Sequence, residues 1–126
     1  MFDIIIPVYN EEKILKEKAD YYYWLKDKTR VIFVDGGSSD KTAEVAKNYG
    51  EVVLSRRGRG RQKNKGEEVS EADKILFLHV DSFIDEKSLE GIDDALSNGI
   101  STGWLTLRID DEKLIFRIFE SLVNFR

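Results

Sequence analysis

A chain of 126 residues with 20 lysines and arginines against 24 aspartates and glutamates carries a formal net charge of −4. This balance argues against nucleic acid as the main partner, because duplex binding normally requires a net basic face. The absence of cysteine and the single histidine exclude a disulfide scaffold, a thiolate metal site and every histidine-rich zinc motif. The length fits one domain, which we take to be residues 1–126.

The sequence contains no segment typical of targeting to a membrane. Its N-terminus runs directly into a strand-like pattern, without the charged region that precedes the apolar part of a signal peptide. No apolar run approaches the length that spans a bilayer. We therefore expect a cytoplasmic protein with no transmembrane segment.

The first half of the chain alternates between strand and helix patterns. Residues 2–8 form a short apolar, β-branched run that predicts a buried strand, and residues 11–25 predict a helix with one apolar face. A second strand is predicted over residues 30–35. A helix over residues 40–49 follows, which Ser38 or Ser39 can cap.

The second half continues the alternation. After a third strand over residues 51–55, residues 56–66 predict a loop rich in glycine and arginine that leads into a helix ending near Ala72. Residues 74–79 predict the fourth strand and residues 85–96 a helix.

The last segments predict a strand and a helix. Residues 102–109 alternate in hydrophobicity and so predict a half-exposed strand, and residues 112–126 predict a broadly apolar helix. Strict alternation of this kind predicts an α/β fold, a mainly parallel sheet with helices on both faces. In such sheets ligands bind at the carboxyl ends of the strands.

The loop after the first strand carries Tyr9 and Glu11 but no glycine, which excludes the Rossmann dinucleotide motif. A tyrosine at a strand end can stack on a planar base, and Glu11 can accept a hydrogen bond from that base. The structural alternative is a helix N-terminus with Asn10 as its cap.

The loop after the second strand begins with Asp35 and paired glycines. Glycines allow the backbone to approach a ligand closely, while the carboxylate can accept hydrogen bonds from a base or a ribose. The structural alternative is a tight turn between strand and helix with a serine cap.

After the fourth strand come His79 and Asp81, two residues apart. On an extended chain such side chains point the same way, so they can converge on Mn²⁺ or Mg²⁺ with phosphate oxygens completing the shell. The alternative is a core histidine and an aspartate that caps the next helix. The basic loop itself can bind a diphosphate or be an ordinary solvated charge run.

The order and spacing of four segments resemble the inverting family 2 glycosyltransferases with the GT-A fold. These segments are IIIPVYNEE, VDGGSSDKT, RRGRGRQKNKG and FLHVDS. The last two are similar to a subgroup that has H-x-D where most members have D-x-D. The resemblance implies a Rossmann-like nucleotide-binding half that binds a nucleotide-diphosphate sugar, UDP-linked, together with Mn²⁺ or Mg²⁺.

Carried over by position, the resemblance assigns the donor-binding residues and the metal ligands. The donor-binding residues are Pro7, Tyr9, Glu11, Asp35, Gly37, Ser38, Arg59, Gln62 and Asn64. The metal ligands are Asp81 and His79, the latter replacing the carboxylate that most members carry. No acidic residue stands in a context that matches the family's catalytic base.

The family's catalytic base and acceptor-binding region would follow residue 126. From this resemblance we expect a chain that lacks the C-terminal acceptor half, binds donor without transferring sugar, and forms a homo-oligomer. The alternative function is a non-catalytic nucleotide-binding module or a relic of such an enzyme.

Overall fold

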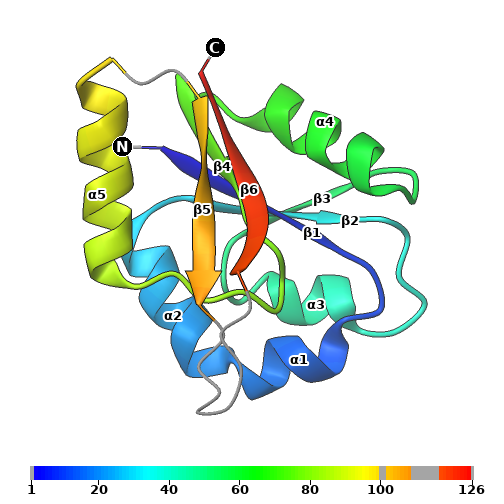
Figure 1. Ribbon diagram of the computed structural model, residues 1–126. Coiled ribbons are helices and arrows are strands. Elements are labelled where there is room, and N and C mark those ends of the chain that lie inside the picture. Colours follow the sequence, from blue (N-terminus) through cyan, green and yellow to red (C-terminus); the bar gives the residue numbers. More distant parts are fainter. Residues whose placement is uncertain (1, 100–101, 109–116, 126) are drawn as a thin grey trace.

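A six-stranded sheet organises the part of the chain that the computed structural model describes, residues 2–99, 102–108 and 117–125 (Figure 1). The strands are β1 (Asp3–Val8), β2 (Val31–Asp35), β3 (Glu51–Leu54), β4 (Lys74–Phe77), β5 (Thr102–Arg108) and β6 (Arg117–Phe125). They lie in the order β3-β2-β1-β4-β6-β5. The first four strands pair in parallel, whereas β6 runs antiparallel to both β4 and β5.

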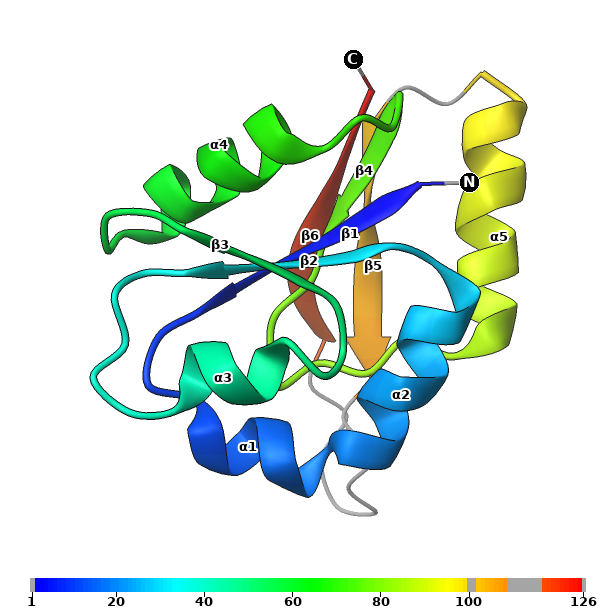
Figure 2. The same ribbon diagram turned by 180° about the vertical axis from the view of Figure 1, so that it is seen from behind.

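Helices cover both faces of the sheet, as predicted. They are α1 (Glu12–Glu17), α2 (Ala19–Lys28), α3 (Thr42–Ala46), α4 (Arg59–Val69) and α5 (Glu86–Ser97). Figures 1 and 2 show α4 apart from the other four helices. None of the helices in the described residues combines the length and hydrophobicity that a membrane crossing requires.

The two faces of the sheet are packed differently. On one face, the β1 side chains Ile4, Ile6 and Val8 join a large apolar core with residues of α1, α2, α3 and α5. On the other face, Ile5 belongs to a smaller cluster of strand residues. Consecutive β1 residues are therefore buried on opposite faces, which explains the continuous apolar run of this strand.

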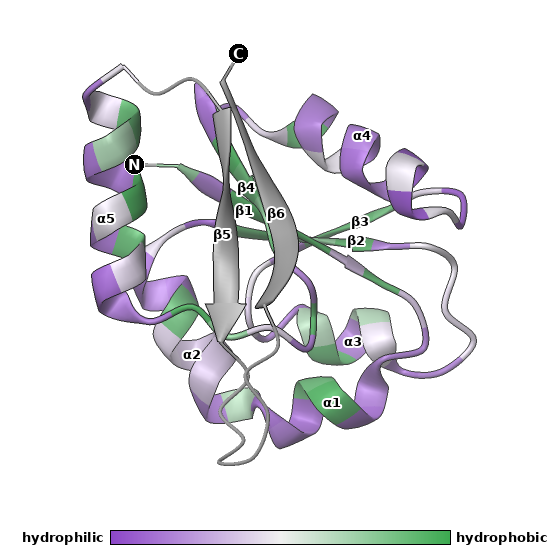
Figure 3. Ribbon diagram, viewed as in Figure 1, coloured by the Kyte–Doolittle hydropathy of each residue, from purple (hydrophilic) through white to green (hydrophobic). Residues whose placement is uncertain are grey.

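Helix α4 covers the smaller cluster although it is almost entirely hydrophilic (Figure 3). It approaches the sheet through Gly66, where an added Cβ would lie 2.4 Å from Cγ2 of Ile5. It is also fixed by Gln62, whose Nε2 donates to the backbone oxygens of Val8 and Val34, both at 2.9 Å. Close backbone approach and two buried hydrogen bonds thus replace an apolar helix face.

The helix predicted over residues 112–126 is wrong where the structure describes it. Residues 117–125 form β6, and residues 112–116 and 126 lie outside the described part. The apolar residues from Ile118 to Val123 have helical spacing, but β6 inserts between β4 and β5 and pairs with both, which gives its backbone groups partners on each side. Strand pairing therefore overrides local periodicity.

Strand β5 confirms the strand predicted over residues 102–109, as far as residue 108. The predicted half-exposure concerns side chains that lie outside the described part.

Two further expectations need correction. The single helix predicted over residues 11–25 is divided at Lys18, whose φ of −98° and ψ of 20° interrupt it. The basic segment is mostly helix, because α4 starts at Arg59 and Gly58, with a φ of 139°, ends the loop. Arginine, glutamine and lysine are good helix formers, which explains why this segment propagates as a helix.

Candidate functional site

The carboxyl ends of β1, β2, β3 and β4 lead into the four loops in which the sequence predicted a ligand site. Because these strands are parallel, their carboxyl ends share one edge of the sheet. Figure 1 shows the turn after β1 beside the loop between β2 and α3. The following contacts join these loops.

Asn10 joins the loop after β1 to the loop after β2. Its backbone nitrogen donates to Oγ of Ser38 at 2.9 Å, and its Oδ1 accepts from the backbone nitrogen of Ser39 at 2.8 Å. Its φ of 50° lies in the left-handed region that asparagine tolerates. The alternative that Asn10 caps α1 is wrong, because its side chain binds the neighbouring loop instead.

Asp35 is buried at the end of β2, with 2% of its surface exposed. Its carboxylate accepts from the backbone nitrogen of Ser38 at 3.2 and 3.3 Å and from the Ser38 hydroxyl. Gly37 has a φ of 90°, which favours glycine, and its ideal Cβ would meet nothing within 4 Å. Asp35 thus fixes the loop, while lone pairs on its oxygens can still accept from a ligand.

The predicted serine cap of α3 is wrong. The cap position is Lys41, whose side chain makes no capping hydrogen bond, and the preceding Asp40 accepts through Oδ1 from the backbone nitrogen of Thr42 at 2.9 Å. The hydroxyl of Thr42 in turn accepts from the backbone nitrogen of Glu11 at 2.8 Å. The helix start therefore provides another link between the first two loops.

Gln62 and Asn64 occupy different sides of α4. Gln62 is buried and uses its amide to join β1, β2 and Gly58, whose backbone nitrogen donates to Oε1 at 3.3 Å. Asn64 is exposed and two residues further on, hence on the opposite side of the helix. Gln62 therefore links the start of α4 to the sheet beneath the candidate site, and the structure does not bring Asn64 to that site.

Arg57 lies against Tyr9, with its guanidinium carbon 4.0 Å from the ring centre. This cation–π contact joins the loop after β3 to the loop after β1. A base that stacks on Tyr9 must use its other face or displace Arg57. The sequence placed Arg57 in the basic loop that can bind a diphosphate, whereas only the fold places its side chain on Tyr9. Pro7, half-buried in β1, lies two residues before this ring.

Arg59, His79 and Asp81 form a chain of contacts between the start of α4 and the loop after β4. Nη2 of Arg59 lies 2.9 Å from Nε2 of His79, and Nδ1 of His79 lies 2.9 Å from Oδ1 of Asp81. A guanidinium can only donate, so Nε2 accepts and Nδ1 carries the proton that is donated to Asp81. The structure thus brings together these three predicted site residues.

Glu11 lies close enough to this chain to interact electrostatically with it. Burial raises the pKa of Glu11 above its ordinary value, and the carboxylates of Asp81 and Asp40 add to that rise. The loops after β1, β2 and β4 therefore share one electrostatic environment.

The predicted donor set for a divalent cation is Asp81 and His79. Among the described residues, no three histidine, aspartate or glutamate side chains gather into a metal-binding group. The Asp81 side chain is 65% exposed and binds His79 through Oδ1, so its other oxygen suits a hard cation. His79 becomes a ligand only when Arg59 leaves Nε2. The residues fit a cation held by one carboxylate, with phosphate and water oxygens as the other ligands.

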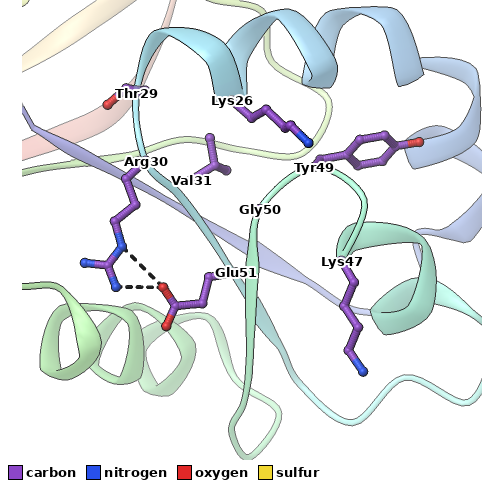
Figure 4. Close-up of a pocket in the computed structure, with 8 residues that line it drawn as sticks. All are labelled: Lys26, Thr29, Arg30, Val31, Lys47, Tyr49, Gly50 and Glu51. Atoms are coloured by element: carbon purple, nitrogen blue, oxygen red, sulfur yellow. Dashed lines mark hydrogen bonds and ion pairs between the residues drawn. The ribbon is translucent and has the colours of Figure 1, made fainter.

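A cavity of about 330 Å³ lies at the opposite edge of the sheet, beside the amino ends of β2 and β3 (Figure 4). It is lined by Lys26, Thr29, Arg30, Val31, Lys47, Tyr49, Gly50 and Glu51. Arg30 is paired there with Oε2 of Glu51 at 2.6 Å, and Nζ of Lys26 donates to the Asn48 backbone oxygen at 3.1 Å. The cavity is therefore separate from the carboxyl edge that carries the candidate site.

Solved glycosyltransferases share this architecture. A Staphylococcus aureus TarS structure (residues 1–349) matches with a TM-score of 0.65 and 22% identity over 90% of this chain and 36% of that chain. The mannosyltransferase PcManGT from Pyrobaculum calidifontis, in complex with GDP-Man and Mn²⁺, matches with a TM-score of 0.67 and 21% identity over 86% of this chain and 35% of that one. The predicted α/β, GT-A-like fold is confirmed.

The model of the family "Glycosyl transferase family 2" matches residues 3–120. The chain belongs to this family. A curated relative is the poly(ribitol-phosphate) beta-N-acetylglucosaminyltransferase TarS of Staphylococcus aureus (strain Mu50 / ATCC 700699), which is 26% identical over 103 residues. That match covers 71% of this chain and 18% of the relative, so the chain spans less than a fifth of the relative's length.

Proposed function

We propose that the carboxyl edge of β1, β2 and β4, with the start of α4, binds the nucleotide-diphosphate sugar donor of a glycosyl transfer. The observation that carries this proposal is the linkage of all four loops. Asn10 joins the first two, Arg57 joins the third to the first, and Arg59 joins the start of α4 to His79. Family membership supplies the chemistry that such an edge serves.

The nucleoside would lie between Tyr9 and Asp35. Tyr9 offers an aromatic face and Asp35 a buried carboxylate, and open space above Gly37 allows backbone approach. This division agrees with base recognition by stacking and by hydrogen bonds to a carboxylate. We propose uridine as the base, although structural relatives were solved with both GDP-Man and UDP-glucose.

The diphosphate would lie beside Arg59 and Asp81. Arg59 offers a guanidinium that can pair with two phosphate oxygens once it leaves His79. Asp81 would hold Mn²⁺ or Mg²⁺, which supplies neutralisation of the negative charge that develops on the leaving diphosphate. We propose that the chain belongs to the subgroup with H-x-D in place of D-x-D. In this arrangement His79 would orient Asp81 through its Nδ1–H.

Calorimetry with UDP, GDP and uridine, each with and without Mn²⁺, tests the donor site. We expect UDP to bind and Mn²⁺ to tighten UDP but not uridine, because the cation contacts only phosphate. A parallel assay of UDP-sugar consumption separates binding from transfer, and turnover would exclude the non-catalytic alternative. The proposal fails if no nucleoside diphosphate binds under any of these conditions.

A further inference from the structure

The break between α1 and α2 places a lysine inside the protein. Lys18 is 9% exposed, and its Nζ donates to the backbone oxygens of Val80 and Ser82, both at 2.8 Å. The hydroxyl of Tyr22 donates to the same Val80 oxygen at 2.6 Å. Three hydrogen bonds from residues 18 and 22 thus converge on the loop after β4, about sixty residues along the chain.

The surroundings of this ammonium are unusual for a buried charge. Besides those two carbonyls, it contacts the rings of Phe83, Tyr21 and Tyr22, whose centres lie 4.0, 4.8 and 5.2 Å from Nζ. Burial lowers the pKa of Lys18 to about 8, against the attraction of Asp81. Burying a charge in this way costs free energy, so a stabilising role alone does not account for it.

The two carbonyls flank Asp81, and His79 precedes Val80. Residues 79–82 form a turn, in which the backbone nitrogen of Ser82 donates to the backbone oxygen of His79 at 3.1 Å. Fixing the carbonyls of residues 80 and 82 therefore restricts the directions in which residues 79 and 81 project. The backbone nitrogen of Ile84, further along the same loop, donates to the Tyr21 hydroxyl at 2.9 Å. The loop is therefore held at several points by Lys18 and by two tyrosines of α2.

We propose that Lys18 and Tyr22 are positioning residues of the donor site, which hold the loop after β4 so that His79 and Asp81 meet the diphosphate. This inference rests on the proposed function for its ligand but not for its geometry. Neither residue has a hydrogen bond to the His79 or Asp81 side chain in the structure. Lys18 acts through the backbone oxygens of Val80 and Ser82, and Tyr22 acts through that of Val80. Loss of either should therefore alter the His79–Asp81 pair before it alters the core.

His79 provides a direct readout because it is the single histidine of the chain. Its imidazole gives one set of NMR signals, and ¹⁵N shifts distinguish the Nδ1–H form from the mixture of tautomers in a free ring. We expect the wild-type signals to show the Nδ1–H form with a slowly exchanging proton. This measurement requires no nucleotide and no metal.

The test compares Lys18→Met and Tyr22→Phe with Lys13→Met, an exposed lysine on α1. We expect Lys18→Met to move the His79 signals towards those of a free imidazole and to weaken UDP binding about tenfold, as loss of an outer-shell partner does. Tyr22→Phe should shift the signals in the same direction by less, because it removes one of two donors to Val80. Lys13→Met should change neither quantity.

Unchanged His79 signals in folded Lys18→Met would overturn the proposal. If Lys18→Met does not fold, Tyr22→Phe decides the matter, and wild-type His79 signals and UDP affinity in that variant would overturn it equally. A wild-type chain that binds no UDP would instead contradict the proposed function, and the His79 signals would still report on the role of Lys18 and Tyr22.

Discussion

The Asp35 carboxylate serves its own loop and, in the proposed site, a nucleoside as well. We predict that Asp35→Ala weakens UDP binding by about 1–3 kcal/mol, because a polar group of the bound base loses its buried partner. Ser38→Ala is the comparison, since it keeps the carboxylate and removes the hydroxyl that donates to Asp35 and accepts from the backbone nitrogen of Asn10. Calorimetry measures both. Equal losses in the two variants would mean that Asp35 acts only by shaping the loop, and an unchanged affinity would exclude Asp35 from the site.

Asp81 is the exposed carboxylate of the proposed diphosphate site. We predict that Asp81→Ala abolishes the gain in UDP affinity on adding Mn²⁺, because the cation then loses its protein carboxylate. The comparison is UDP titrated with and without Mn²⁺, with Asp27→Ala on the exposed surface of α2 as the control. A Mn²⁺ effect that survives in Asp81→Ala would leave Asp81 as an ordinary loop residue.

Lys18 should make stability depend on pH in a definite direction. Its pKa falls from an ordinary 10.5 to about 8 on folding, mainly through burial. Between these values the unfolded chain binds the proton that the folded chain has released, so the free energy of unfolding rises with pH. We predict that urea titrations at pH 7 to 10 show wild type gaining stability relative to Lys18→Met above pH 8. Parallel pH profiles for the two proteins would rule out the shift.

At the scale of elements, α4 shows how a polar helix can cover an apolar sheet face. Its contact depends on Gly66, where a Cβ would lie 2.4 Å from Ile5 and 3.1 Å from Val34. We predict that Gly66→Ala destabilises the fold by about 1–3 kcal/mol through overpacking. The added methyl group should also push α4 away from the sheet. Because α4 places Arg59 beside His79, we expect UDP affinity to fall as well.

Gly60 provides the control for this prediction, since it lies in the same helix and its Cβ would meet nothing within 4 Å. We expect Gly60→Ala to be neutral or to stabilise by up to about 1 kcal/mol, from the helix propensity of alanine. Urea unfolding of the two variants gives the comparison. A Gly66→Ala variant as stable as Gly60→Ala would show that α4 does not depend on close approach.

At the scale of the whole molecule, β3 and β5 are the outermost strands of the described sheet. β3 ends in Leu54, which is 68% exposed, and an edge strand with an exposed apolar residue favours association between copies. We predict a homo-oligomer whose associated fraction falls in Leu54→Lys, as measured by light scattering over a range of concentrations. A wild-type chain that stays monomeric at every concentration would contradict this.

The sequence by itself determined the parallel half of the fold and the location of the chemistry. The apolar runs ending at Val8, Asp35 and Phe77 are strands that are buried on both faces of the sheet. Such burial gives a continuous apolar run, which can be recognised from the local sequence alone. Since the carboxyl ends of parallel strands share an edge, the loops that follow them were predicted to meet. The contact of Asn10 with Ser38 and that of Arg59 with His79 agree with that prediction.

Only the tertiary structure decided which side chains of the candidate site contact one another and which are buried against the sheet. Gln62 donates to the backbone of β1 and β2, and Arg57 packs on the Tyr9 ring. Lys18, at the break between α1 and α2, binds the loop after β4. Strand β6 likewise forms because β4 and β5 flank it, although its own spacing is helical. Each of these depends on partners distant in sequence, and local periodicity carries no information about such partners.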